Sequence, residues 1–259
     1  MKVYSLRAEP GDPRYLQATQ GNYAFWQRGY EIVPFVRDDL QAGRLDADLT
    51  TAIESTLVWG SVAVVREAVE RAGRMPPPNI DFPPELSAYV GREIREATMA
   101  DVRRWVNAEA KTLPVHVKPR DRQKLFAGKV VSAFRDLIPL SGVDDDEPVV
   151  VQEVLKFRSE WRAYVLRRRA LNVSHYKGDG IVFPDAAVIS RAISDFASSP
   201  IGYGMDWAVT QDGRTVLVEV NDGFALGNYG MSGNQYTALV ECRWREMMGL
   251  EDNGVGFEF

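Results

Sequence analysis

Short apolar runs alternate with helical patterns along the first third of the chain. Three runs predict strands, at residues 3–6, 31–36 and 56–59. Residues 15–28 and 61–73 carry apolar side chains at helical spacing, and Gly73 stands where helices commonly end. Strands that alternate with helices are typical of a parallel sheet with crossover connections. We therefore expect a small α/β lobe in this region.

A proline-rich segment follows at residues 75–84, with five prolines in ten positions. Proline fixes φ and removes a backbone donor, so we expect this segment to be a stiff connector. Helical patterns come next, at residues 85–96 and 99–110. Thr98, with Asp101 three positions later, forms a capping-box signal for the second of these helices.

The rest of the chain has the pattern of strands and hairpins followed by a helix. The expected strands lie at residues 113–119, 149–155, 161–166, 170–176, 205–209 and 215–221, and the helix at residues 235–248. This mixture predicts α+β organisation. The basic turn at residues 167–169 is expected to be solvated rather than an anionic-substrate patch.

Composition narrows the classes of function. The chain has 259 residues, and 31 basic against 36 acidic side chains give a net charge of −5. This balance gives no general electrostatic reason to bind nucleic acid or an anionic membrane. One cysteine and two histidines exclude an internal disulfide framework and a Cys- or His-rich metal centre. Because there is neither a long apolar run nor a secretory signal pattern at the start, we expect a cytoplasmic protein.

The most informative stretch is the hairpin pattern at residues 203–223. Asp212-Gly213 between alternating apolar runs predicts a two-residue turn. With that turn, Asp206 faces Glu219, Trp207 faces Val218 and Val209 faces Val216. Asp206, Glu219 and Asn221 then share one face, while an apolar set shares the other, namely Trp207, Val209, Val216, Val218 and Val220.

Two carboxylates directly opposite one another repel, so a partner is needed to neutralise them. One interpretation is a solvent-facing polar surface relieved by a nearby lysine or arginine. The other is a Mg²⁺ site, because hard oxygen ligands with room for waters and phosphates are what Mg²⁺ takes in phosphoryl-transfer enzymes. The pair alone does not decide between them.

Basic side chains are frequent at the end of the expected strand at residues 113–119 and in the loop that follows it. Lys118 ends that strand, and a basic loop at residues 119–128 includes Lys124. This loop could close over phosphates or be a hydrated surface loop. It lacks the GxxxxGK[ST] pattern, and the chain contains no GxGxxG, so both common nucleotide fingerprints are absent.

Another pair of charges follows the strand at residues 149–155. Glu160 and Arg162 share one face of their strand with Tyr164, and Trp161 and Ala163 share the other. Taken alone, this pattern is also compatible with an ion pair on an exposed strand, which contributes little stability.

The order of these features resembles the ATP-grasp superfamily. The matching features are Lys118 on a strand, the basic loop, QEVL at 152–155, EWR at 160–162, and a strand pair with Asp206, Glu219 and Asn221. The resemblance covers about residues 85–248. EWRAYV and KLFAG resemble a branch met in bacteria and phages, the clade marked by two arginines and a lysine, and Arg162 would be one of those arginines.

The resemblance implies a role for each matched residue. Lys118, and with it Lys124, would contact the nucleotide phosphates, and Arg162 would stabilise the transferring phosphoryl group. The hinge residues that would contact adenine are Gln152, Glu153, Val154 and Leu155. Glu160 would hold the ribose hydroxyls. The Mg²⁺ ligands would be Asp206, Glu219 and Asn221.

The fold implied is α/β plus α+β. Residues 1–84 would form a short N-terminal α/β lobe with its proline-rich connector. Residues 85–259 would form an ATP-grasp domain of two α+β subdomains, at about residues 85–150 and 151–259.

The activity implied is that of an ATP- and Mg²⁺-dependent carboxylate–amine ligase, which forms a C–N bond through an acyl-phosphate and releases ADP. Its partners would be ATP, a carboxylate and an amine, drawn from amino acids, peptides or proteins, with no nucleic acid and no membrane. Two alternatives stay open: an ATP-grasp phosphotransferase and a catalytically silent nucleotide-binding or interaction module. The loop at residues 227–230 either lines the acceptor site or is a plain connection, and the oligomeric state is open.

Overall fold

The computed structural model describes residues 1–122, 125–256 and 258. Its first sheet is parallel, with the strand order β2-β1-β3. The strands are β1 (Lys2–Leu6), β2 (Glu31–Phe35) and β3 (Thr56–Trp59), as the apolar runs predicted. The accompanying helices are α1 (Tyr15–Gln27), α2 (Arg37–Gln41), α3 (Asp46–Thr51) and α4 (Val62–Arg71). Helices α2 and α3 are too short to produce a helical period, which is why the sequence did not reveal them.

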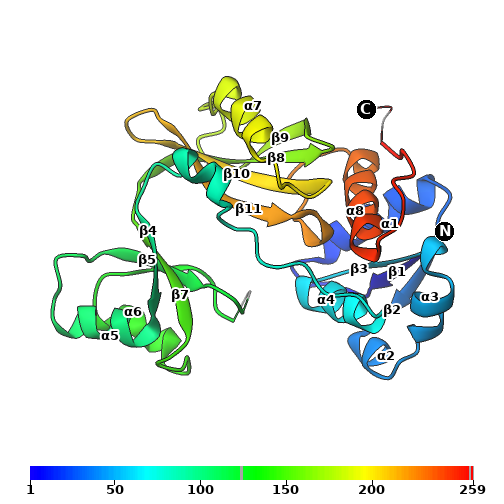
Figure 1. Ribbon diagram of the computed structural model, residues 1–259, viewed down its shortest axis with the longest axis horizontal. Helices are drawn as coiled ribbons and strands as arrows, with labels where there is room; N and C mark the ends of the chain where they lie inside the picture. The colour runs from blue at the N-terminus through cyan, green and yellow to red at the C-terminus, as the bar shows by residue number, and fades with distance from the viewer. Residues whose placement is uncertain (123–124, 257, 259) are drawn as a thin grey trace.

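The second sheet is antiparallel and lies to one side of the molecule (Figure 1). Its strand order is β4-β7-β5-β6, and its strands are β4 (Ile94–Thr98), β5 (Val115–Pro119), β6 (Lys129–Val131) and β7 (Pro148–Glu153). Helices α5 (Met99–Asn107) and α6 (Phe134–Leu137) cover it, and their apolar side chains share a core with the sheet. Strand β7 crosses residue 150, so the chain leaves this sheet only after Glu153.

The helix predicted over residues 85–96 was wrong. A 3-10 helix covers Pro84–Tyr89, and strand β4 follows. Gly91 between them has a φ of +61°, which interrupts a right-handed helix. Ile94 pairs with Gln152 on β7, so contacts far along the chain override the local pattern. The capping box at the start of α5 is confirmed, since the Asp101 backbone N–H donates to the Thr98 hydroxyl at 3.2 Å.

The third sheet is antiparallel and has the order β11-β10-β8-β9. Its strands are β8 (Phe157–Leu166), β9 (Arg169–Gly178), β10 (Gly202–Thr210) and β11 (Thr215–Asp222). Helix α7 (Ala186–Asp195) packs on one face, where Ile189 and Ile193 share a core with Ala163 and Val165. Helix α8 (Gly233–Met248) lies on the other side, between this sheet and the first one (Figure 1).

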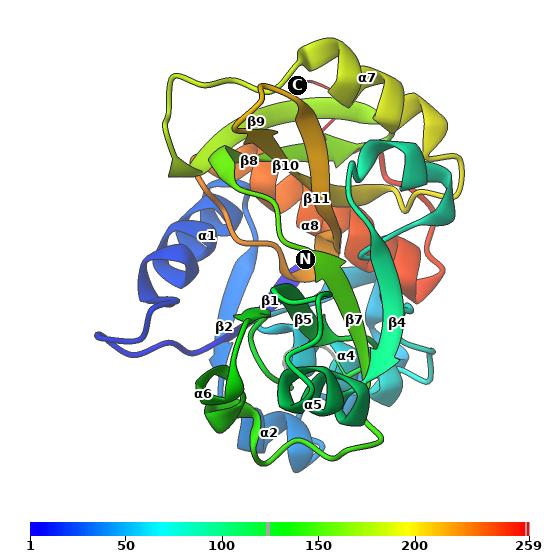
Figure 2. The ribbon, with the colours of Figure 1, turned by 90° about the vertical axis from the view of Figure 1, so that its left-hand side faces the viewer.

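Helix α8 joins the N-terminal sheet to the third sheet. It packs against α1, and one core runs from β1 and β3 through α8 to Tyr164 on β8. The indole N–H of Trp244 donates to the Thr56 carbonyl oxygen at 2.8 Å. Figure 2 shows the N-terminal sheet and the second sheet on the same side of the third sheet. Among the helices described, none is long and apolar enough to cross a membrane.

Candidate active site

The β10–β11 hairpin places Asp206 opposite Glu219, as the pattern predicted. The predicted two-residue turn was wrong, however. Thr210 N–H donates to the Arg214 carbonyl at 2.9 Å around a three-residue loop, in which Gly213 has a φ of +86°. A loop of this length with glycine in the left-handed region is the next commonest hairpin solution.

The longer loop moves the neighbouring pairs by one residue. Trp207 pairs with Leu217 and not Val218, and Val209 pairs with Thr215 and not Val216. A β-bulge between Asp206 and Trp207 then restores the predicted pairing toward the far end of the strands. The apolar face accordingly contains Leu217 beside Trp207.

Asp206, Glu219 and Asn221 lie together, as expected. The amide nitrogen of Asn221 lies 3.3 Å from a carboxylate oxygen of Asp206 and 3.3 Å from one of Glu219. Asp206 accepts two hydrogen bonds from Arg162, each 2.7 Å long, and both side chains are buried. Burial outweighs this ion pair and raises the pKa of Asp206.

Lys118 joins this cluster from the end of β5. Its ammonium group donates to a Glu219 carboxylate oxygen at 2.8 Å and forms an ion pair with Asp81 of the proline-rich connector. The Lys118 nitrogen also lies 4.5 Å from the centre of the Phe82 ring. Burial alone would lower the pKa of Lys118, but the charges of Glu219 and Asp81 outweigh it and raise that pKa. For Glu219, burial opposes ionisation and the charge of Lys118 outweighs it, so the pKa is lowered.

Two cavities meet at Asn221 and Ala225. The first, of about 230 Å³, is lined by residues that include Lys118, Glu219 and Gly128. The second, of about 340 Å³, lies between the N-terminal lobe and the third sheet, with Arg162 in its wall. Asn221 lines both cavities, so a group bound in one would lie next to a group bound in the other.

The predicted hinge residues connect the second sheet to the third, with Gln152 and Glu153 ending β7 and residues 154–155 in the connection. Gln152 accepts hydrogen bonds from the Arg92 guanidinium at 2.9 and 2.7 Å. Arg92 also donates to the carbonyl oxygens of Leu217 and Val218 on β11, at 2.7 Å each. Arg92 therefore ties the two sheets together, and burial lowers its pKa to about 10. Sequence reasoning missed it because it lies in the segment assigned to a helix.

Glu160 is buried and accepts from the Tyr176 hydroxyl at 3.1 Å and the Lys177 ammonium at 2.5 Å. It does not pair with Arg162, so the interpretation as an ion pair within one strand was wrong. Lys124 lies outside the described residues.

The basic turn is exposed at Arg168 and Arg169, as expected, and it is also bonded to its own chain. Arg167 and Arg168 both have positive φ, the Arg167 side chain pairs with Asp252, and Arg168 donates to the carbonyl oxygens of Ser194 and Phe196. The loop at residues 227–230 lines the larger cavity through Gly227 and Tyr229.

The donors around Asn221 suit Mg²⁺. Glu219 and Asn221 line the smaller cavity, and Asp206, which does not line it, is paired with Arg162. One or two carboxylates, together with waters and phosphate oxygens, are the usual protein contribution to a Mg²⁺ site. Among the described residues no group of three or more His, Cys, Asp or Glu side chains has metal-site geometry, and a site here would combine two carboxylates with the amide oxygen of Asn221.

Comparisons with known proteins identify the fold. A family model described as ATP-grasp domain, R2K clade family 2, matches residues 89–239, which is more than half of the 259-residue chain. No curated protein matches the chain. A D-alanine–D-alanine ligase from Bacillus anthracis, complexed with ATP, is 15% identical with a TM-score of 0.55, and the alignment covers 95% of this chain and 94% of that chain.

Two other solved structures are similar. A RimK domain ATP-grasp protein from Sphaerobacter thermophilus is 18% identical with a TM-score of 0.53, covering 85% of this chain and 91% of that chain. The ATP-grasp ligase PsnB, complexed with a minimal precursor, is 15% identical with a TM-score of 0.50, covering 93% of this chain and 98% of that chain. At these identities the structures establish a shared fold, and the family model establishes membership. The chain belongs to the ATP-grasp family, in its R2K clade.

Proposed function

We propose that this protein is an ATP- and Mg²⁺-dependent carboxylate–amine ligase. The observation that carries the proposal is the meeting of the two cavities at Asn221. One cavity has the lysine and oxygen donors suited to phosphates and a metal ion. The other has room for a second substrate beside them. Such an arrangement suits phosphoryl transfer from ATP to a neighbouring carboxylate, because that reaction depends on positioning and charge stabilisation.

The positions of Lys118, Arg162 and the Asp206, Glu219 and Asn221 cluster support a role for each of them. Lys118 would bind phosphate oxygens, and Arg162, which borders the larger cavity, would stabilise charge on the transferring phosphoryl group. Glu219, Asn221 and Asp206 would hold Mg²⁺, which neutralises charge on the phosphates when bound. The resemblance to the ATP-grasp family, and not a place in either cavity, supports Glu160 on β8 as the residue that would bind the ribose and the backbone of residues 152–155 as the part that would bind adenine. Both parts of the chain would contribute to each side of the site, since Arg14 and Arg162 line the larger cavity and Asp81 and Lys118 line the smaller one.

The reaction proposed has two steps. A carboxylate oxygen of the substrate attacks the γ-phosphorus of ATP, the bond from that phosphorus to the bridging oxygen breaks, and ADP leaves. An amine nitrogen then attacks the acyl carbon, and the carbon–oxygen bond to phosphate breaks. The products are an amide and phosphate, and the proton from the amine passes to phosphate or solvent. An amino acid, a peptide or a protein could supply the acid or the amine.

The test measures nucleotide binding first. Wild-type protein should bind ADP more tightly with MgCl₂ than without it, and Glu219→Gln should lose most of that difference. Lys118→Ala should weaken ADP binding under both conditions. Glu96→Gln, an exposed glutamate on β4, is the matched control and should behave as wild type. Equal dependence on Mg²⁺ in wild type and Glu219→Gln would contradict the metal site.

Turnover distinguishes the possible reactions. Hydroxylamine, a small amine that traps acyl-phosphates, should give a hydroxamate and ADP with a suitable acid. A stable phosphorylated product in its place would identify a phosphotransferase. ATP binding without turnover across a broad panel of acids and amines would favour a silent nucleotide-binding module.

A further inference from the structure

Several basic side chains line the larger cavity. Its wall includes three arginines, Arg7, Arg14 and Arg162, and no aspartate or glutamate among the described lining residues. Apolar side chains such as Leu226 and Trp59 form much of the remainder. A volume of about 340 Å³ suits a small molecule or the last residues of a peptide rather than a folded domain.

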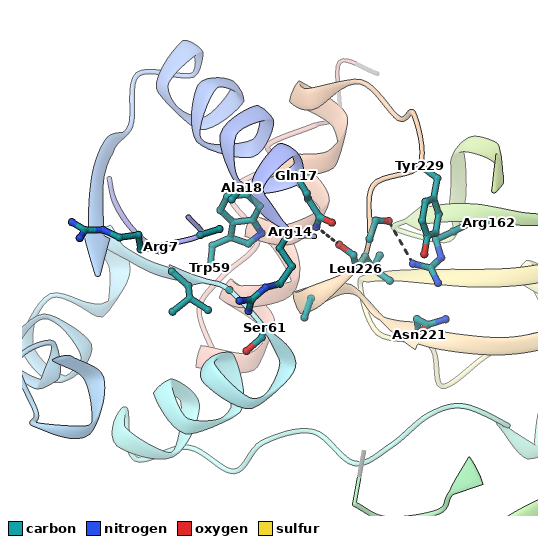
Figure 3. Close-up of a pocket in the computed structure, with 15 residues that line it drawn as sticks. Arg7, Arg14, Gln17, Ala18, Trp59, Ser61, Arg162, Asn221, Leu226 and Tyr229 are labelled. Carbon is teal, nitrogen blue, oxygen red and sulfur yellow. Dashed lines mark hydrogen bonds between the residues drawn. The ribbon is translucent and has the colours of Figure 1, made fainter. Parts of the chain in front are cut away.

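The two ends of this cavity come from different parts of the chain. Arg162 and Asn221 lie at the end next to the smaller cavity, which contains Lys118. Arg14, in contrast, comes from the segment that leads into α1 (Figure 3). Figure 3 shows the guanidinium of Arg14 near Ser61, on the side of the N-terminal lobe and across from Arg162 and Asn221, while Arg7 points away from the other labelled side chains. Arg14 is thus the cation placed to meet a group that extends away from the phosphates.

Arg14 is held in place but keeps donors available. Its Nε donates to Asp12 at 2.9 Å and one Nη also bonds Asp12, so these bonds use two of the five guanidinium N–H groups. Within the described part of the chain, no further side-chain bond of Arg14 is found, and its side chain is 55% exposed. A guanidinium whose orientation is fixed on one edge is well prepared to bind a carboxylate on another.

We propose that the larger cavity binds an acid with a second carboxylate, whose reacting carboxylate lies by Asn221 and Arg162 and whose other carboxylate is bound by Arg14. This inference rests on the proposed ligase function for the identity of the reacting end. Asp12 offsets part of the Arg14 charge but does not line the cavity, so an ammonium group at the Arg14 end would find no carboxylate among the described lining residues, whereas a carboxylate would find the remaining N–H groups of Arg14. A dicarboxylate is therefore favoured over a cationic substrate. Arg14 would therefore determine specificity.

The two carboxylates could belong to a free dicarboxylic acid or to an acidic residue at the C-terminus of a peptide. The probes are therefore glutarate, L-glutamate and the peptide Gly-Gly-Glu. Each is compared with the analogue in which one carboxylate is an amide, namely glutaramate, L-glutamine and Gly-Gly-Gln. Preference for Gly-Gly-Glu over the two free acids would identify a peptide substrate, and the reverse a metabolite.

Two readouts are used on the full chain. The first is the shift in melting temperature caused by each acid in the presence of ADP and MgCl₂, which needs no turnover. The second is hydroxamate formation with ATP and hydroxylamine. Wild type should favour at least one diacid over its amide. Arg14→Gln should raise the KM and the Kd for that diacid about tenfold, leave kcat nearly unchanged, and not alter the values for the amide.

The control variant is Arg44→Gln. Arg44 is an exposed arginine of the same lobe that pairs with Asp39 and does not line the cavity. It should behave as wild type in both assays.

The outcomes separate this inference from the proposed function. Equal effects of Arg14→Gln on diacid and amide, or turnover of monoacids in preference to diacids, would overturn the inference and leave the ligase function standing. Diacid binding that depends on Arg14, without hydroxamate from any acid, would support the inference and refute the ligase function. No binding and no turnover with any probe would refute both.

Discussion

Substitution of Asp81 is the most direct test of the electrostatics around Lys118 in the proposed nucleotide site. Asp81 comes from the connector between the N-terminal lobe and the ATP-grasp domain, and it shares the ammonium of Lys118 with Glu219. Its backbone carbonyl also accepts from the Val220 N–H at 2.9 Å, which holds the connector against β11. Asp81→Asn removes one negative charge and keeps the shape of the side chain. The backbone contact to β11 should survive the change.

Removing the negative charge of Asp81 should strengthen the binding of ADP. Lys118 is only 8% exposed and faces two carboxylates, so the cluster has a net negative charge where phosphates would bind. A unit charge about 6 Å from a phosphate charge is worth about 3 kcal/mol at an effective dielectric constant of about 20. Screening by water in the open cavity would reduce this to about half. Asp81→Asn should therefore tighten ADP binding without Mg²⁺ by about tenfold.

Turnover should respond in the opposite sense. Burial raises the pKa of Asp81 despite the nearby ammonium, yet the ion pair still fixes the position of Lys118. Without that pair, kcat in the presence of Mg²⁺ should fall while the KM for ATP stays the same or decreases. The free energy of unfolding should also fall, by about 1–2 kcal/mol, because a charged hydrogen bond becomes a neutral one.

Isothermal titration with ADP, with and without MgCl₂, measures the binding change. Asp121→Asn is the control, since Asp121 is an exposed carboxylate that pairs with Arg120 and does not line the cavity with Lys118. An unchanged or weaker affinity for ADP without Mg²⁺ in Asp81→Asn would refute the electrostatic reasoning.

The remaining predictions concern chemistry and packing elsewhere in the fold. Burial raises the pKa of the Cys242 thiol to about 12, so the native protein should resist iodoacetamide at pH 8 while the denatured protein reacts. Rapid labelling of the native protein, measured by mass, would contradict the packing of α8. Gly178→Ala should lower the free energy of unfolding by several kcal/mol, because φ is +81° and a Cβ atom would lie 2.2 Å from the Arg158 carbonyl oxygen. Gly213→Ala has a similar φ of +86° but open space around it, so it should cost only about 1 kcal/mol in the same denaturant titration. Equal losses would show that the contact with Arg158 is unimportant.

The sequence predicted best where structure is set locally. The strands of the first sheet and the capping box of α5 follow from residues within a few positions of one another. The acidic group could be predicted for a similar reason, since one hairpin contains Asp206, Glu219 and Asn221. Lys118 was found by its place at a strand end.

The partners of those residues could not be predicted, because they are brought together by contacts between distant segments. Asp81 reaches Lys118 only because the connector lies across two sheets, held by the carbonyl contact to β11 and by the Asn79 amide, which donates to the Arg120 carbonyl at 3.0 Å. Arg92 bonds Gln152 sixty positions away. No periodicity or spacing in the sequence carries such information, so the cation and anion partners of the site appear only in the folded chain.

The β-bulge explains why the pairing of Asp206 with Glu219 was right although the turn was wrong. With the three-residue loop and no bulge, Glu219 would pair with Met205 and share its face. Met205 is fully buried in the core beside Trp207 and Leu217, so the Glu219 carboxylate would enter an apolar environment, where an unpaired charge costs several kcal/mol. The bulge takes up one residue and returns Glu219 to the face where Lys118 and Asn221 lie. Burial of a carboxylate in the core is thus avoided by the same irregularity that completes the candidate metal site.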